Sequence, residues 1–347
     1  MHSTPLPVHL ITGLLGSGKT TTVKHLLTQK PENERWGILI NEFGDIDIDV
    51  ASLQSNASEQ VSLKQVSGGC VCCTAQLSLV EAINQLLTQN SNSNQPLDRL
   101  LIEPTGLGHP AKIIDTLKHT TFKQPLALQA IVCVITPKQL TETRWQKSAV
   151  MRDLVTLADI VVLNQTDLSS ESQQACSNAI LENLYPSKSQ VIHSRFGAVP
   201  LNTLMQAHTP APFVFLAGLD EHHNQMVSES NEHASTIANT QACQVSTNAQ
   251  QNIISVGWVW PASLQFNRVK LKTFFATLAP KLNRAKGLLK TGNEWQLINW
   301  TEQQLQFSDI AWRQDSRLEL LIKPKIQLNF NDLKYIEAQL LNCIHKT

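Results

Sequence analysis

The sequence predicts an α/β protein that consists of a doubly wound, mostly parallel sheet and a second, smaller α+β domain. Short apolar runs alternate with amphipathic stretches over residues 1–209, and a glycine-rich loop joins the first run to the first amphipathic stretch. Strands that alternate with helices in this way form parallel sheets. After a polar interval, a second alternation begins near residue 253. The chain has 347 residues, which is enough for two domains with separate cores.

The apolar runs of the first domain are predicted strands. They are almost continuously apolar, which is typical of strands that are buried on both faces of a sheet. They span residues 8–12, 37–41, 100–103, 127–135, 160–164 and 190–194. Amphipathic patterns predict helices between them, at residues 20–29, 77–88 and 173–184.

The polar stretch at residues 210–251 is rich in Ser, Asn, Gln and His and has almost no apolar periodicity. We therefore predict a linker between the two domains. The second domain, residues 252–347, is predicted to be α+β. Its strands are expected at residues 253–260, 294–299 and 318–322, and its helices at 269–278 and 331–344.

Composition excludes several classes of protein. The chain has 28 basic and 28 acidic side chains, and they form no basic stripe of the kind that nucleic-acid-binding proteins carry. No apolar run is long enough for a membrane span, and the N-terminal segment lacks the pattern of an export signal. Three of the seven cysteines are clustered, which favours a metal site in a reducing compartment. We expect a cytoplasmic protein that binds neither nucleic acid nor membranes.

Residues 13–20, Gly-Leu-Leu-Gly-Ser-Gly-Lys-Thr, match the Walker A pattern of phosphate-binding loops in full. The loop follows a predicted strand and opens a predicted helix, so its N–H groups and the helix N-terminus can surround a phosphate. In this P-loop pattern Lys19 reaches the β- and γ-phosphates, and the Thr20 hydroxyl ligates Mg²⁺. The predicted nucleotide ligands are Gly13, Gly16, Ser17, Gly18, Lys19, Thr20 and Thr21.

The predicted strand at residues 100–103 ends in a carboxylate, as a Walker B strand does. The segment Glu103-Pro104-Thr105-Gly106 resembles the Asp-x-x-Gly switch of GTPases, with Glu in place of Asp. Glu103 would hold Mg²⁺ through water, and the Gly106 N–H would sense the γ-phosphate. The candidate catalytic residues are thus Lys19, Glu103 and Gly106, and the candidate magnesium ligands are Thr20 and Glu103.

A third motif follows the predicted strand at residues 160–164. The segment Asn164-Gln165-Thr166-Asp167 resembles the guanine-reading Asn-Lys-x-Asp of GTPases, and we expect Asn164 and Asp167 to bind the nucleotide. The Asp167 carboxylate can accept from guanine N1–H and the exocyclic amine, which adenine does not offer. Gln165 departs from the motif, which usually has Lys here. Lys lays its stem along the base and tethers the phosphate loop, whereas Gln is shorter and neutral. His193-Ser194-Arg195, after the next predicted strand, is where GTPases place a further base-contacting loop.

The segment Gly68-Gly69-Cys70-Val71-Cys72-Cys73 brings three thiols close together. Thiolates select soft or borderline metals such as Zn²⁺, Cu⁺ or Co²⁺. Three of them leave a tetrahedral zinc one ligand short, to be completed by water, a partner's ligand or a nearby carboxylate. The alternatives are buried packing of the thiols or a strained disulfide between Cys72 and Cys73. Cys133 lies in the middle of a predicted strand and is expected to be an inert core thiol.

The cysteine cluster lies between two segments where P-loop GTPases keep their nucleotide-sensing loops. One is Asn41-Glu42-Phe43-Gly44-Asp45, and the other is Glu103–Gly106. Metal and γ-phosphate would then act on one stretch of chain, as a nucleotide-gated metal carrier requires. The carboxylates of Glu42 and Asp45 are further candidate metal ligands.

In this order, these motifs resemble the CobW family of metallochaperone GTPases. The resemblance extends into the second domain, at Arg284-Ala285-Lys286-Gly287 and Ser316-Arg317-Leu318-Glu319-Leu320. It implies a SIMIBI-type P-loop domain, slow GTP hydrolysis, and zinc or a related metal such as cobalt at Cys70, Cys72 and Cys73. It also implies transfer of that metal to a client metalloprotein; a homo-oligomer is compatible with the sequence. Two features depart from the family. Asp45 stands where members of the family often have Glu. The linker has few histidines, such as His222 and His223, whereas many members have a long His-rich linker, so these histidines can also belong to a solvated loop that binds no metal.

Two other functions compete with the metal-delivering GTPase. One is a P-loop ATPase or kinase in which the cysteines hold a structural zinc, although Asp167 and an open three-thiol site argue against it. The other is a metal sensor or store without catalysis, which a complete Walker A motif disfavours.

Overall fold

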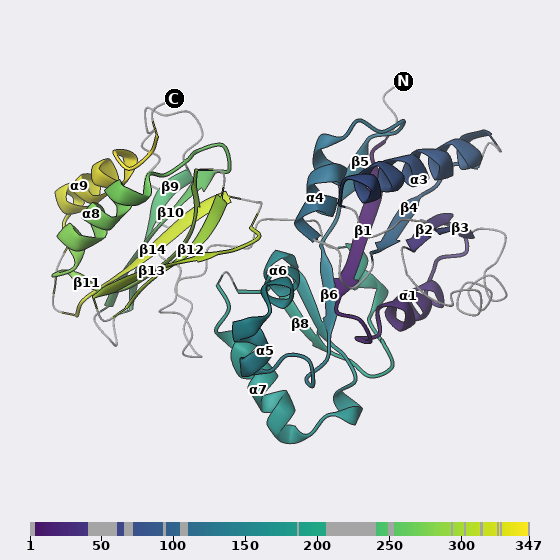
Figure 1. Cartoon of the computed structure of the whole chain (residues 1–347), viewed down its shortest axis with the longest axis horizontal. Coiled ribbons are helices and arrows are strands. Elements are labelled where there is room, and N and C mark those ends of the chain that lie inside the picture. Colours follow the sequence, from purple (N-terminus) through teal and green to yellow (C-terminus); the bar gives the residue numbers. More distant parts are fainter. Residues whose placement is uncertain are drawn as a thin grey trace. The chain divides into compact units, whose positions relative to one another are not determined.

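The chain divides into two compact units, Met1–Ala211 and Pro212–Thr347, in its computed structural model (Figure 1). The structure describes residues 4–40, 61–65, 72–92, 95–104, 110–185, 187–205, 241–248, 253–292, 294–301, 303–312, 315–324, 326 and 328–345. Within these ranges, no helix combines the length and the apolar character that crossing a membrane requires.

The first unit is built on an eight-stranded sheet with the order β3-β2-β4-β1-β6-β7-β8, in which β5 also pairs with β1. The pairings between these strands are parallel. The strands are β1 (Leu6–Gly13), β2 (Trp36–Ile40), β3 (Val61–Gln65), β4 (Arg99–Glu103), β5 (Leu126–Leu128), β6 (Val132–Ile135), β7 (Ile160–Leu163) and β8 (Gln190–His193). The predicted α/β class with a mostly parallel sheet is confirmed.

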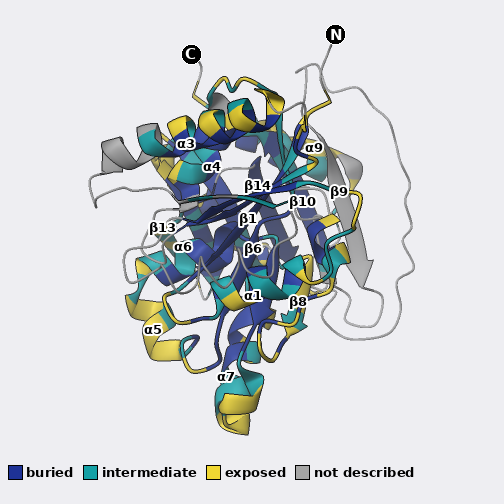
Figure 2. Ribbon diagram, turned by 90° about the vertical axis from the view of Figure 1, so that its right-hand side faces the viewer, coloured by how far each residue is buried: buried dark blue, intermediate teal, exposed yellow. Residues whose placement is uncertain are grey.

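Helices cover both faces of this sheet. On one face, α1 (Lys19–Leu27) places Val23 and Leu26 in a core with Ile11 of β1 and Ile38 of β2. On the other face, α3 (Cys72–Asn92) packs so closely that a Cβ at Gly37 would lie 2.7 Å from the Leu86 side chain. The central strands of the sheet are accordingly buried, while the outer sides of the helices are exposed (Figure 2).

The remaining helices of this unit follow β4, β6, β7 and β8. The α-helices are α4 (Pro110–His119), α5 (Glu142–Lys147), α6 (Ala149–Leu157) and α7 (Glu171–Glu182). Two short 3-10 helices are η1 (Thr166–Leu168) and η2 (Leu201–Met205). Of these, α7 begins with a reciprocal cap, in which the Ser170 hydroxyl accepts from Gln173 N and the Gln173 side chain accepts from Ser170 N.

Three predicted elements of the first unit have different bounds in the structure. The strand predicted at residues 127–135 is interrupted between β5 and β6, where the amide of Ile131 donates to the Asp159 carboxylate at 2.7 Å. The helix predicted at 77–88 is longer and begins at Cys72. The prediction that every strand is buried on both faces is wrong for β8, which ends the strand order beside β7 and has largely exposed side chains.

The second unit is an antiparallel six-stranded sheet with the order β13-β12-β11-β14-β10-β9. Its strands are β9 (Gln241–Asn248), β10 (Ile253–Pro261), β11 (Leu282–Thr291), β12 (Glu294–Thr301), β13 (Gln304–Asp309) and β14 (Asp315–Ile322). The helices α8 (Arg268–Leu278) and α9 (Phe330–Leu341) pack on one face, where Phe275 and Leu340 join Trp258 and Trp260 in one core.

The predicted α+β character of the second unit is confirmed, but its strand content is larger than predicted. Residues 241–248, predicted as part of the linker, form β9 and pair with β10. Neither β11 nor β13 was expected, because their polar and apolar residues do not alternate over the full length of each strand.

Candidate nucleotide and metal site

The predicted phosphate loop lies at the carboxyl end of β1, in the middle of the parallel sheet. β1 has β4 on one side and β6 on the other. The chain leaves β1 through α1 toward β2, which lies beyond β4, whereas β6 to β8 build the opposite half. Open α/β sheets bind ligands at such a reversal of strand order, so the fold favours this edge as the ligand site.

Glycines allow the loop to take its shape. Gly13, Gly16 and Gly18 have φ values of 145°, 75° and 95°, in the left-handed half of conformational space. A Cβ at Gly13 would clash with the Val134 carbonyl of β6, and one at Gly18 would clash with the Asn164 amide. The loop therefore has to approach β6 and the Asn164 side chain more closely than any other residue type permits.

Two polar side chains of the loop suit an anion. Ser17 is fully buried, and its hydroxyl has no hydrogen-bond partner among the described residues. Lys19 is also largely buried, and its ammonium group folds back across the loop to donate to the Leu14 carbonyl at 3.2 Å. A phosphate bound inside the loop would offer acceptors to both groups.

The two predicted magnesium ligands are adjacent. The Thr20 hydroxyl, at the start of α1, donates to Oε1 of Glu103 at 2.8 Å. Glu103 is buried at the carboxyl end of β4. A hydroxyl and a carboxylate side by side are hard oxygen ligands of the kind Mg²⁺ prefers, so the residues present fit the ion.

The predicted guanine-reading motif is bonded directly to the phosphate loop. Asn164 is buried after β7, and its amide group donates to the Ser17 carbonyl at 2.9 Å. Gln165, with a left-handed φ of 58°, donates from Nε2 to the Gly16 carbonyl at 3.1 Å. Gln165 thus makes a tether to the phosphate loop although it is shorter than the Lys usual at this position.

A third loop closes the same edge of the sheet. Ser194, directly after β8, accepts at its carbonyl from the amide and the hydroxyl of Thr166 at 3.2 and 3.1 Å. The amide of Gly197 donates to Oδ1 of Asn164 at 3.0 Å. His193 and Arg195, predicted together with Ser194 as base-contacting, have exposed side chains. Asp167, in η1, is likewise exposed and accessible to a ligand.

Several predicted residues lie outside the described ranges, namely Glu42, Asp45, Cys70 and Gly106. The backbone of Cys72 and Cys73 forms the first turn of α3. Within the described ranges, no group of three or more His, Cys, Asp or Glu side chains could hold a metal ion. Cys133 is buried on β6, and burial raises its pKa to about 12, as expected for a core thiol.

With this geometry in place, similarity to known proteins decides the family. A model described as the CobW/HypB/UreG nucleotide-binding domain matches residues 7–191, which is more than half of the chain. The chain belongs to the CobW/HypB/UreG family.

One relative in this family extends the likeness beyond the nucleotide-binding domain. The zinc chaperone YeiR of Escherichia coli (strain K12) is 35% identical over 327 residues, which cover 92% of this chain and 94% of that protein. The zinc-regulated GTPase metalloprotein activator 1 of Schizosaccharomyces pombe is 30% identical over 183 residues, covering 51% of this chain and 43% of that protein. The crystal structure of the Zn(II)-bound YjiA GTPase from E. coli aligns with 97% of this chain and 99% of its own at 17% identity, with a TM-score of 0.42.

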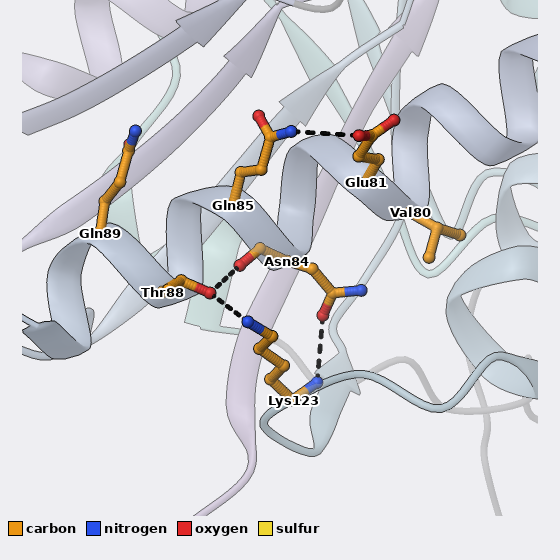
Figure 3. Close-up of a pocket in the computed structure, with 7 residues that line it drawn as sticks. All are labelled: Val80, Glu81, Asn84, Gln85, Thr88, Gln89 and Lys123. Carbon is orange, nitrogen blue, oxygen red and sulfur yellow. Dashed lines mark hydrogen bonds between the residues drawn. The ribbon is translucent and has the colours of Figure 1, made fainter.

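Outside the nucleotide-binding edge of this CobW/HypB/UreG domain, α3 carries a surface groove of 780 Å³ (Figure 3). Polar contacts border it: the Lys123 ammonium donates to the Thr88 hydroxyl at 2.7 Å, and the Lys123 amide donates to Oδ1 of Asn84 at 3.1 Å. Its lining includes none of the predicted nucleotide or metal ligands, and we assign no ligand to it.

Two structural features of this family domain were missed by sequence reasoning. One is the tether from Gln165 to the phosphate loop, and the other is the bond between Gly197 and Asn164. The Phe196-Gly197 dipeptide directly after the His193-Ser194-Arg195 segment was the available signal, because glycine is favoured where a loop must pass close to another backbone.

Proposed function

We propose that this chain hydrolyses GTP and uses the nucleotide cycle to deliver zinc, or a related soft divalent metal, to a client metalloprotein. One observation carries the proposal. Cys72 and Cys73 form the first turn of α3, and α3 leads into β4, whose last residue, Glu103, bonds Thr20 of the phosphate loop. The predicted metal and nucleotide sites are therefore connected by one helix and one strand.

The nucleotide half of the proposal rests on the phosphate loop. Lys19 neutralises charge on the β- and γ-phosphates, and the loop amides and the Ser17 hydroxyl orient them. Thr20 and Glu103 would hold Mg²⁺, which would neutralise charge that develops on the phosphates. Gly106, on the segment after Glu103, senses the γ-phosphate. The relative named as a zinc-regulated GTPase metalloprotein activator supports hydrolysis of GTP by this chain.

The base half rests on Asp167. Its exposed carboxylate accepts from guanine N1–H and the exocyclic amine, while Asn164 holds the motif against the phosphate loop. Replacing Asp167 by Asn removes one acceptor and should weaken the preference for guanine over adenine nucleotides by about 1–3 kcal/mol. Competition of GDP and ADP against a fluorescent GDP analogue measures this preference. Equal affinities for GDP and ADP in the unmodified chain would contradict the role of Asp167.

The metal half rests on Cys70, Cys72 and Cys73. Their thiolates suit zinc and leave one coordination position for water, a carboxylate such as Glu42 or Asp45, or a ligand from the client. An incomplete ligand set favours release over permanent storage. The names of relatives as zinc chaperones support zinc as the cargo.

A zinc titration against a chelating dye tests the metal site. Cys72→Ser should lower zinc affinity steeply, because a hydroxyl is a poor zinc ligand beside two thiolates. Cys176→Ser is the matched control, since Cys176 is a partly exposed free cysteine on α7, remote in sequence from the cluster. Equal zinc affinity in the two variants would refute the proposed metal site. Metal-free GTP affinity should be unchanged in both.

A further inference from the structure

The loop after β8 carries an aromatic side chain in an unfavourable setting. Phe196 is 77% exposed and has a φ of 54°. Among the described residues other than glycine, only Gln165, Phe196 and Gln303 have positive φ. For a bulky residue this conformation is strained, and strain of this kind persists where the surrounding structure imposes it, often at binding sites.

The surroundings of Phe196 impose this conformation from both sides. Before it, the Ser194 carbonyl accepts two hydrogen bonds from Thr166. After it, the Gly197 amide donates to the buried Asn164 side chain. Both anchors, Asn164 and Thr166, belong to the segment that ends in Asp167. The loop cannot relax Phe196 without breaking contacts to the guanine-reading motif.

A third contact fixes the loop on the nucleotide side. Gly197 passes so close to the start of α1 that a Cβ on it would lie 2.7 Å from the amide nitrogen of Thr22. The Ser194 hydroxyl closes the loop on itself by donating to the Ala198 carbonyl at 2.9 Å. The backbone on either side of Phe196 is therefore held between the proposed base-reading motif and the helix that follows the phosphate loop.

We propose that Phe196 stacks on the guanine base that Asp167 recognises, an inference that rests on the nucleotide site proposed above. An aromatic ring offers a flat apolar face to a base. When the ring and the base stack, the two faces that meet are removed from water. The need for such a ring is greater here because Gln165 has a shorter apolar stem than Lys. Phe196 is a specificity and affinity residue in this assignment and takes no part in the chemistry at the phosphates.

The test compares binding of GDP and of inorganic tripolyphosphate, both with Mg²⁺ and without zinc. Phe196→Ala should weaken GDP binding by roughly 5- to 150-fold, the range of aromatic–base stacking. Tripolyphosphate affinity should not change, because it has no base. Phe196→Tyr and Phe196→Trp keep a ring and should bind GDP within about threefold of the unmodified chain. Tyr335→Ala, which removes an aromatic side chain that is 60% exposed on α9, should bind GDP normally.

Phe196→Gly distinguishes the effect of losing the aromatic ring from the effect of backbone strain, because glycine adopts positive φ without strain. It should lose GDP affinity as Phe196→Ala does. A spectroscopic readout adds to this: in Phe196→Trp, GDP should quench fluorescence beyond any change in the parent chain, which already contains seven tryptophans.

Unchanged GDP affinity in Phe196→Ala would overturn the inference, as would equal weakening of GDP and tripolyphosphate, which would indicate a collapsed loop. Failure of the proposed nucleotide site gives a different result. The unmodified chain would then bind GDP no more tightly than tripolyphosphate, and every base-contact assignment would fall with it.

Discussion

At the scale of single residues, the departure of Gln165 from the usual Lys is compensated within the fold. The side chain of Gln165 reaches the Gly16 carbonyl, so the base motif and the phosphate loop remain connected. The left-handed backbone of Gln165 aims its amide at the loop. A shorter, neutral residue can thus serve as the tether, with less apolar stem beside a bound base.

We predict that Gln165→Ala weakens GDP binding by about 0.5–1.5 kcal/mol, the usual net contribution of one hydrogen bond. Both residues share the same strained backbone, so strain cancels in the comparison. Gln165→Lys should bind GDP at least as tightly as the unmodified chain. Calorimetric titration with GDP measures both, and full affinity in Gln165→Ala would show that the tether contributes nothing to binding.

At the scale of elements, the loop after β8 and the start of α1 depend on each other. Gly197 and Gly292 have the same φ of 68°, but a Cβ at Gly292, between β11 and β12, meets nothing within 4 Å. The two glycines therefore form a matched pair that separates backbone strain from steric contact.

Replacing Gly292 by Ala should cost about 1–2 kcal/mol of stability, the left-handed penalty alone. Gly197→Ala should cost more, because its Cβ also meets the backbone of Thr21 and Thr22 at 2.9 and 2.7 Å. It should weaken GDP binding too, since moving the loop breaks its bond to Asn164. Thermal unfolding and GDP titration of both variants check this. Equal losses of stability in the two variants would mean that α1 moves away from the added Cβ at residue 197 without a loss of folding free energy.

The opposite edge of the parallel sheet contains a polar cluster around the buried side chain of His9. Arg99 pairs with Glu34 at 3.0 Å and donates to Nε2 of His9 at 3.3 Å. Burial lowers the pKa of His9 to about 3, with the charge of Arg99 acting in the same direction and that of Glu34 against it. His9 is therefore neutral in the folded chain at pH values where it is protonated in the unfolded chain.

The sign of the pH effect follows from this difference. Between pH 6.5 and 3 the unfolded state binds a proton at His9 and the folded state does not, so stability falls as the pH falls. Going from pH 7.5 to 5.5, the unmodified chain should lose about 1.4 kcal/mol relative to His9→Gln, which cannot titrate. Urea unfolding of both at the two pH values measures the difference. If the unmodified chain and His9→Gln lost the same stability between the two pH values, His9 would have to be protonated in the folded state as well.

At the scale of the whole molecule, coupling between metal and nucleotide is the property that the proposed function requires. If zinc changes GTP affinity, GTP must change zinc affinity by the same factor. A carrier that releases metal on hydrolysis holds zinc differently in its GTP and GDP forms, by something like 1–3 kcal/mol.

We therefore predict different zinc affinities for the chain when empty, with GDP, and with a non-hydrolysable GTP analogue. Competition against a chelating dye in the three states measures them. Lys19→Ala, which loses the cation placed on the β- and γ-phosphates, should abolish the difference while retaining zinc binding. Equal zinc affinity in all three states of the unmodified chain, within about a factor of two, would exclude gated delivery and leave a GTPase with an uncoupled metal site.

The sequence by itself determined the features that depend on local chemistry. The Walker A loop between β1 and α1 was predictable because its glycine spacing, the apolar run before it and the helix after it all follow one another in the chain. The α/β class followed from alternation of strands and helices, and the family resemblance followed from the order of the motifs. The thiol-rich segment was visible for the same reason, since its cysteines are neighbours.

Only the tertiary structure decided contacts between segments far apart in the chain. The Thr20–Glu103 bond, the tether from Gln165 to Gly16 and the Gly197–Asn164 bond each join residues that the sheet brings together. The break between β5 and β6 depends on the side chain of Asp159, and β9 exists because β10 offers it an edge. Such choices rest on competition for backbone hydrogen bonds across the fold, which local sequence patterns do not encode.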